Sequence, residues 1–255
     1  MTGRAYGGDM PETMTLHAPD GEPFAAYLAR PAQQPRGGLV LIHEIWGLTD
    51  HIIDVADRFA AEGYVVIAPD ILSHAGVEPA LGQELFALMN SKDEGARTAG
   101  QPRMREALAA SHAPEYAAWA TGALTAAVDH LDEQPGVDGR IGAVGYCFGG
   151  TYAFLLAAAD ARVRAVVPFY GTAPDAERIQ NIQAAVLAFY GGTDTALMQA
   201  LPVVRQDMTA SGVDFTPVVY DRAAHAFFND TGARYDADAA ADAWQRTMAF
   251  LALHL

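Results

Sequence analysis

Apolar runs of strand length alternate with longer segments of helical pattern along most of the chain. Two short strands are predicted at 13–17 and 23–30 around an Asp20-Gly21 turn, which is typical of an antiparallel hairpin. Further strands are predicted at 38–43, 64–68, 140–144, 163–167, 184–190 and 214–220, and helices at 50–62, 116–131, 150–159 and 236–254. Continuous apolar strands between helices indicate a mostly parallel, twisted sheet with helices on both faces. The pattern therefore predicts an α/β fold with an antiparallel hairpin at one edge.

Residues 72–118 interrupt this alternation with several glycines and three prolines. Such an insert commonly covers the carboxyl edge of a parallel sheet, where ligands bind, although an ordinary pair of surface helices also fits the pattern. We predict a loose N-terminal arm over residues 1–11 and a single domain over 12–255 that contains the insert.

Composition narrows the classes of function. The formal charge of −15 argues against nucleic acid and anionic membrane surfaces as partners. One cysteine excludes an intrachain disulfide. No apolar core of signal-peptide length is found in the first twenty residues, and no run approaches a membrane span. We expect a cytoplasmic protein that acts on a small molecule, and both a monomer and a homodimer remain open.

The most informative motif is Gly145-Tyr-Cys-Phe-Gly149, which lies between a predicted strand and a predicted helix. It has the form of the strand–turn–helix elbow that presents a catalytic nucleophile, here Cys147. A helix N-terminus favours a thiolate through its dipole and free N–H groups. The alternative is a free cysteine buried at the start of a core helix.

A cysteine nucleophile needs a base and a group that orients the base. Hydrolases with this elbow place the acid and then the histidine after the nucleophile. His225 follows a predicted strand, whereas His254 is the penultimate residue of the last helix. Asp194, in a glycine-rich turn at a strand end, is the favoured acid; its rivals are Asp175, Asp207 and Asp214.

The loop after the strand at 38–43 is expected to complete the site. Its Ile45 N–H and the Phe148 N–H are the candidate oxyanion donors. Glu44 points to the same edge of the sheet. A His43-Glu44 pair can begin a zinc motif, but no second histidine follows at the required spacing, so we expect no metal.

The segments 43–47, 145–150, 191–194 and 225–227 together resemble the dienelactone hydrolase family, in the same order and over roughly residues 12–255. The resemblance implies an α/β-hydrolase fold, no cofactor, and hydrolysis of a small ester or lactone through a thioester acyl-enzyme. It implies Cys147 as nucleophile, His225 as base and Asp194 as orienting acid. It also implies that Glu44 lies against the resting thiol and moves when substrate binds.

The chain departs from this family four residues after the histidine, where Asn229 replaces an arginine that, in the family, helps to bind the substrate carboxylate and pairs with the glutamate. A second such arginine would come from the insert, among Arg97, Arg103 and Arg105. Because Asn229 supplies no cation, we predict a preference for neutral esters. The expected lining of the substrate pocket is Trp46, Tyr146, Tyr170, Phe227 and Asn229.

Two other functions remain as alternatives. One is a hydrolase-fold protein that does not turn over and uses Cys147 as a redox or ligand-binding thiol. The other keeps the enzyme and changes the substrate to a peptide or a thioester. A complete Cys–Asp–His set in the expected order favours hydrolysis of small esters or lactones.

Overall fold

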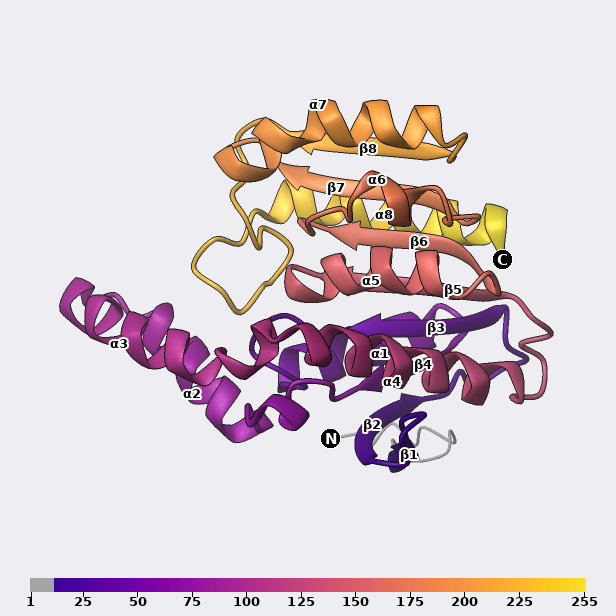
Figure 1. Ribbon diagram of the computed structural model, residues 1–255, viewed down its shortest axis with the longest axis horizontal. Helices are drawn as coiled ribbons and strands as arrows, with labels where there is room; N and C mark the ends of the chain where they lie inside the picture. Colours follow the sequence, from indigo (N-terminus) through magenta and orange to yellow (C-terminus); the bar gives the residue numbers. More distant parts are fainter. Residues whose placement is uncertain (1–11) are drawn as a thin grey trace, which may run out of the picture.

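An eight-stranded sheet runs through the computed structural model, which describes residues 12–255 (Figure 1). The predicted arm over 1–11 lies outside the described residues. The strand order is β1-β2-β4-β3-β5-β6-β7-β8. The strands are β1 (Glu12–His17), β2 (Pro23–Ala29), β3 (Gly37–Ile42), β4 (Tyr64–Pro69), β5 (Ile141–Tyr146), β6 (Val163–Phe169), β7 (Ala185–Gly191) and β8 (Phe215–Tyr220). Only β2 pairs antiparallel, with β1 and with β4, so the predicted hairpin and mostly parallel sheet are confirmed.

Helices cover both faces of the sheet, which explains why every residue of β3, β4 and β5 is buried. One face carries α4 (Pro114–Asp132), α5 (Phe148–Ala159), α6 (Ala176–Ile179) and α7 (Thr195–Ala210). The other carries α1 (Asp50–Ala61) and α8 (Ala237–His254), and here Phe59 packs on Trp244 with ring centroids 4.6 Å apart. No helix in this described part of the chain is long and apolar enough to cross a membrane.

The segment predicted as an insert forms the short helices η1 (Ser73–Ala75) and η2 (Ala110–His112) around a pair of longer ones, α2 (Pro79–Met89) and α3 (Glu94–Ala107). Figure 1 shows α2 and α3 beyond the end of the sheet to which the arrows of β6, β7 and β8 point. A Cβ atom on Gly82 of α2 would lie 1.8 Å from the carbonyl oxygen of Trp46. Helix α2 therefore rests directly on the loop that follows β3.

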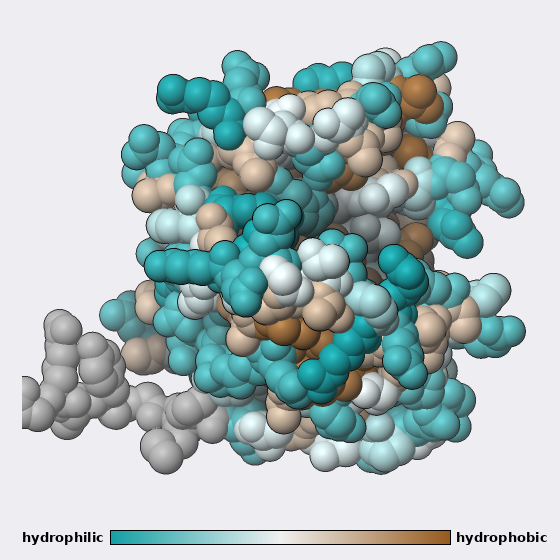
Figure 2. Space-filling model, turned by 90° about the vertical axis from the view of Figure 1, so that its left-hand side faces the viewer, coloured by the Kyte–Doolittle hydropathy of each residue, from teal (hydrophilic) through white to brown (hydrophobic). Residues whose placement is uncertain are grey.

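The carboxyl edge of the sheet gathers the loops that follow β3, β5, β7 and β8. Parallel neighbours end at the same edge, so residues far apart in sequence meet there. Figure 2 looks onto this end of the molecule, where mostly hydrophilic side chains surround smaller apolar areas.

Candidate active site

Cys147 stands at a sharp turn between β5 and α5. Its backbone has φ 56° and ψ −113°, a strained conformation that directs its side chain out of the turn. A Cβ on Gly145 would lie 2.0 Å from the Gly149 carbonyl oxygen, and one on Gly149 would lie 2.1 Å from that of Ile42. The two glycines of the motif are thus required because backbone packs against backbone on both sides of the cysteine.

His225 and Asp194 meet at this cysteine from the loops after β8 and β7. The His225 Nε2 lies 3.0 Å from the Cys147 Sγ, and its Nδ1 lies 2.6 Å from the Asp194 Oδ2. A carboxylate only accepts hydrogen bonds, so the imidazole hydrogen sits on Nδ1 and the Nε2 lone pair faces the thiol.

The rival acids are engaged elsewhere or lie in other elements. Asp175 caps α6 through the Arg178 N–H at 3.0 Å, Asp207 lies within α7, and Asp214 precedes β8. Asp194 is the one candidate acid that contacts His225 among residues 12–255.

Two backbone N–H groups reach the sulfur, those of Phe148 and Ile45. Both lower the pKa of the Cys147 thiol, because a donor stabilises the thiolate. They are the same two groups that the sequence predicted as oxyanion donors.

His43 holds the loop that carries Ile45. This histidine is fully buried, its Nδ1 donates to the Glu44 carbonyl at 2.8 Å, and its Nε2 accepts from the Ile71 N–H at 3.2 Å. Burial lowers the pKa of His43, so the ring stays neutral. Sequence reasoning considered His43 only as a zinc ligand and missed this structural role. Nowhere in the described chain do three His, Cys, Asp or Glu side chains gather closely enough to hold a metal ion.

Glu44 is buried beside the nucleophile, with only 2% of its surface exposed. The Asn229 amide donates to its Oε2 at 2.6 Å. Burial raises the pKa of Glu44 to about 7, although the Asn229 hydrogen bond and the positive charge of Arg234 lower it. Burial and then the charge of Glu44 raise the pKa of Cys147 to about 12. Both effects favour the protonated thiol over the thiolate.

Comparison with known proteins assigns the chain to a family. The family model described as the dienelactone hydrolase family matches residues 24–255. The chain belongs to that family. It is accordingly a hydrolase of the ester and lactone class.

Relatives match this family member over almost their whole length. A protein of Saccharolobus solfataricus, provisionally named carboxymethylenebutenolidase, is 31% identical over 91% of this chain and 95% of its own. The carboxymethylenebutenolidase of Pseudomonas putida is 28% identical over 94% and 96%. A crystal structure from Klebsiella pneumoniae, provisionally named a dienelactone hydrolase, is 28% identical, covers 96% of this chain and 100% of its own, and has a TM-score of 0.79.

A cavity of about 440 Å³ opens beside Ile45 and contains two arginines. Arg97 comes from α3, and Arg234 comes from the loop after β8. The remaining lining residues are Trp46, Met89, Asn90, Ser91, Met104 and Ala233. Asn229 supplies no cation, but Arg97, one of the insert arginines left open by the sequence, and Arg234 both line this cavity. Arg234 was missed because it lies nine residues beyond His225 in a loop without regular structure, and no linear signal marks it.

The other insert arginines differ from Arg97. Arg103 forms an exposed ion pair with Glu84, with 2.6 Å between Nη1 and Oε1. Arg105 is exposed near the end of α3 and does not line this cavity.

The predicted pocket residues divide into two groups. Trp46 lines the cavity, and Asn229 is buried against Glu44. Tyr146, Tyr170 and Phe227 are at most 1% exposed, so they offer no surface to a substrate and belong to the aromatic core. Their prediction as pocket residues is corrected by the packing: Tyr170, for example, lies under the imidazole of His225, with ring centroids 5.0 Å apart.

Proposed function

We propose that this chain hydrolyses small esters or lactones with Cys147 as the nucleophile, through a thioester acyl-enzyme. The observation that carries the proposal is the chain of contacts from Asp194 to His225 at 2.6 Å and from His225 to the Cys147 sulfur at 3.0 Å. A nucleophile, a base and an orienting acid in contact are what covalent catalysis requires.

In acylation, His225 Nε2 takes the thiol proton as the sulfur attacks the substrate carbonyl carbon. The carbonyl oxygen becomes an oxyanion, and the Ile45 and Phe148 N–H groups stabilise it. The carbon–oxygen ester bond then breaks. His225 gives its proton to the departing alkoxide, and the acyl group remains on sulfur. In a lactone the alcohol is part of the same molecule, so it stays attached to the acyl group.

Deacylation repeats this sequence with water as the nucleophile and the Cys147 sulfur as the leaving group. His225 takes a proton from a water molecule, whose oxygen attacks the thioester carbon. The carbon–sulfur bond breaks, the carboxylic acid leaves, and the proton returns to the sulfur. Asp194 keeps the imidazole in the required tautomer and stabilises its charged form throughout.

Glu44 keeps the thiol protonated between turnovers. A carboxylate beside the sulfur disfavours a second negative charge, and the raised pKa of Cys147 supports this role. A thiol oxidises and alkylates more slowly than a thiolate, so the arrangement protects the nucleophile.

The cavity beside Ile45 supports a revised substrate preference. Arg97 and Arg234 offer two cations to a carboxylate, while Trp46, Met89 and Met104 offer apolar contacts. Esters or lactones that carry a carboxylate are therefore accepted, in place of the neutral preference expected from Asn229 alone.

The test is hydrolysis of a panel of p-nitrophenyl esters, small lactones, thioesters and peptides by the wild type and by Cys147→Ala. The wild type should hydrolyse the esters and lactones, and mass spectrometry should find the acyl group on Cys147. The alanine variant should lose turnover, and Cys147→Ser should retain little because a hydroxyl ionises much less readily. Unchanged turnover in Cys147→Ala contradicts the proposal. Absence of turnover in the wild type, with reversible oxidation of Cys147, favours the redox thiol instead.

A further inference from the structure

The amide of Asn229 has one orientation in this site. Its Oδ1 accepts two hydrogen bonds from Thr231, from the backbone N–H at 3.0 Å and from Oγ1 at 2.7 Å. Its Nδ2 donates to Glu44 at 2.6 Å. A flipped amide would set its oxygen against the carboxylate and its NH₂ against the Thr231 N–H. Thr231 therefore decides which end of the amide faces Glu44.

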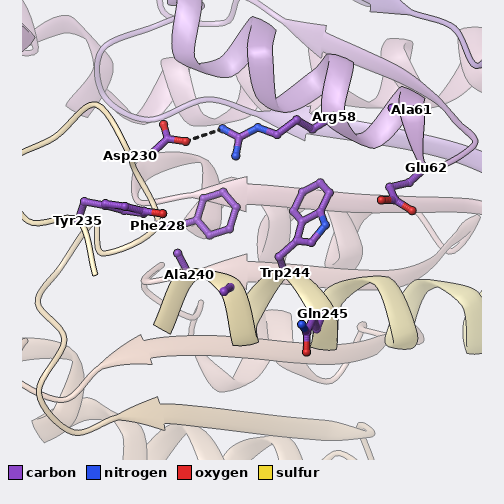
Figure 3. A pocket seen from close by; sticks show the side chains of 10 residues that line it. Arg58, Ala61, Glu62, Phe228, Asp230, Tyr235, Ala240, Trp244 and Gln245 are labelled. Carbon is purple, nitrogen blue, oxygen red and sulfur yellow. Dashed lines mark hydrogen bonds and ion pairs between the residues drawn. The ribbon is translucent and has the colours of Figure 1, made fainter. Parts of the chain in front are cut away.

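The residue between Asn229 and Thr231 is Asp230, and it is anchored to helix α1. Asp230 pairs with Arg58 at 3.1 Å and lies 3.3 Å from the Nδ1 of His51. Figure 3 shows the Asp230–Arg58 contact at the rim of a cavity of about 420 Å³ between α1 and α8. Arg58 also pairs with Asp54, one turn earlier in α1, at 2.7 Å. The segment 229–231 is thus held to a rigid element, while Asn229 itself is only 3% exposed.

We propose that Thr231 is a positioning residue, which fixes the Asn229 amide so that this amide holds the Glu44 carboxylate beside the Cys147 thiol. The proposal rests on the proposed function, in which Glu44 restrains that thiol. Thr231 does not touch the sulfur and acts through Asn229 alone. Because an amide is neutral, it holds the carboxylate in place without cancelling the negative charge that acts on the sulfur.

Weakening the contacts from Thr231 to Asn229 and from Asn229 to Glu44 should increase the fraction of Cys147 that is present as thiolate. When the Thr231 hydroxyl is absent, the amide is held by one donor instead of two, and Glu44 loses part of its restraint. A carboxylate that moves away, or that becomes protonated, repels a thiolate less. More thiolate at a given pH means faster reaction of Cys147 with an alkylating reagent.

The test compares the rate of iodoacetamide alkylation of Cys147, at one pH near neutrality, in the wild type and in Thr231→Val. Loss of one hydrogen bond predicts an increase of about two- to tenfold. Thr231→Ser, which keeps the hydroxyl, should restore the wild-type rate. Thr209→Val is the matched control, since the Thr209 hydroxyl donates to the Arg205 carbonyl within α7, at 2.8 Å. This control should leave the rate unchanged.

Thr231→Val made in a Glu44→Gln background separates a positioning role of Thr231 from a general loosening of the structure around Cys147. Without the charge, Thr231→Val should add nothing to the rate, because two residues that act through one contact are not additive. An equal increase in both backgrounds overturns the proposal, as does an unchanged rate in Thr231→Val when Glu44→Gln is faster. If Glu44→Gln itself leaves the rate unchanged, the proposed restraint by Glu44 is what fails. Should Thr231→Val not fold, Thr231→Ala takes its place in both backgrounds.

Discussion

The buried Glu44 carboxylate lies near the half-buried Cys147 thiol, and its charge raises the pKa of that thiol. Glu44 is 2% exposed and receives one hydrogen bond from a neutral amide. Burial of a charge with so little compensation costs stability. The cost is concentrated at the residue that is proposed to control the nucleophile, as is common at functional sites.

The pH dependence of stability should reveal this cost. The pKa of Glu44 is raised from 4.5 to about 7, so between these values the folded state binds a proton that the unfolded state does not. The contribution of Glu44 to stability therefore falls as pH rises from about 4.5 to 7. Glu44→Gln removes this loss of stability. Its free energy of unfolding should be nearly that of the wild type at pH 5 and about 1–3 kcal/mol higher at pH 8.

Urea denaturation of both proteins at the two pH values measures this difference. Glu106→Gln, at an exposed position of α3, is the control and should show no such difference. A Glu44→Gln effect that is equal at pH 5 and pH 8 would show that Glu44 is ionised throughout.

At the scale of elements, α2 and the loop after β3 form one packed unit. Gly82 lies so close to the Trp46 carbonyl that even a methyl group cannot be added without moving the helix or the loop. Phe86, one turn later in α2, packs edge-on against the Trp46 ring with centroids 5.6 Å apart. The position of the loop that carries Ile45 thus depends on a helix outside the sheet.

Gly82→Ala should disturb catalysis more than folding. The added Cβ would lie 1.8 Å from the Trp46 oxygen, so α2 or the loop must shift, and the Ile45 N–H shifts with it. A misplacement of about 1 Å in an active site can lower the reaction rate roughly a hundredfold. We therefore expect kcat/KM of Gly82→Ala to fall by about ten- to a hundredfold. Gly95→Ala in α3, where the new Cβ meets only the Asp93 side chain at 3.2 Å, should keep wild-type kinetics. Equal kinetics in the two variants would show that α2 does not position the loop.

Over the whole molecule, a formal charge of −15 repels anions, whereas the cavity beside Ile45 is lined by the two cations Arg97 and Arg234. The two arginines come from separate segments, α3 and the loop after β8, and line one cavity. We expect these arginines to attract an anionic ester only within about one Debye length, roughly 8–10 Å at 0.10–0.15 M ionic strength.

Arg234→Gln should lower kcat/KM for an ester that carries a carboxylate by about ten- to a hundredfold, the range of one charge-assisted hydrogen bond. The neutral ester of the same size should lose much less, because for it Arg234 acts only through the pKa values of Glu44 and Cys147. Arg103→Gln is the control, because Arg103 is exposed and paired with Glu84. Equal losses on both esters in Arg234→Gln would show that Arg234 supports the loop and does not bind the carboxylate.

The sequence by itself determined the architecture and the main chemical groups. Apolar runs indicate which strands are buried, and this determined the sheet. Parallel strands end at one edge, so Cys147, Asp194 and His225 could be assigned to that edge from their positions after strands. The elbow around Cys147 is a local motif, and local motifs are readable from neighbouring residues. Chain order restricted the base to His225 or His254, and the position of His225 after a predicted strand selected it.

Only the tertiary structure decided the contacts between loops. Asn229 and Glu44 are separated by 185 positions. The family resemblance linked position 229 to the glutamate through an arginine, but only the fold shows that the Asn229 amide makes a 2.6 Å contact with the carboxylate. Arg234 enters the site from an irregular loop, and Tyr146 and Phe227 are buried because surrounding elements cover them. The physical reason is the same in each case. Periodicity in a sequence records which residues are buried within an element, whereas the neighbours of a loop side chain are set by how separate elements pack.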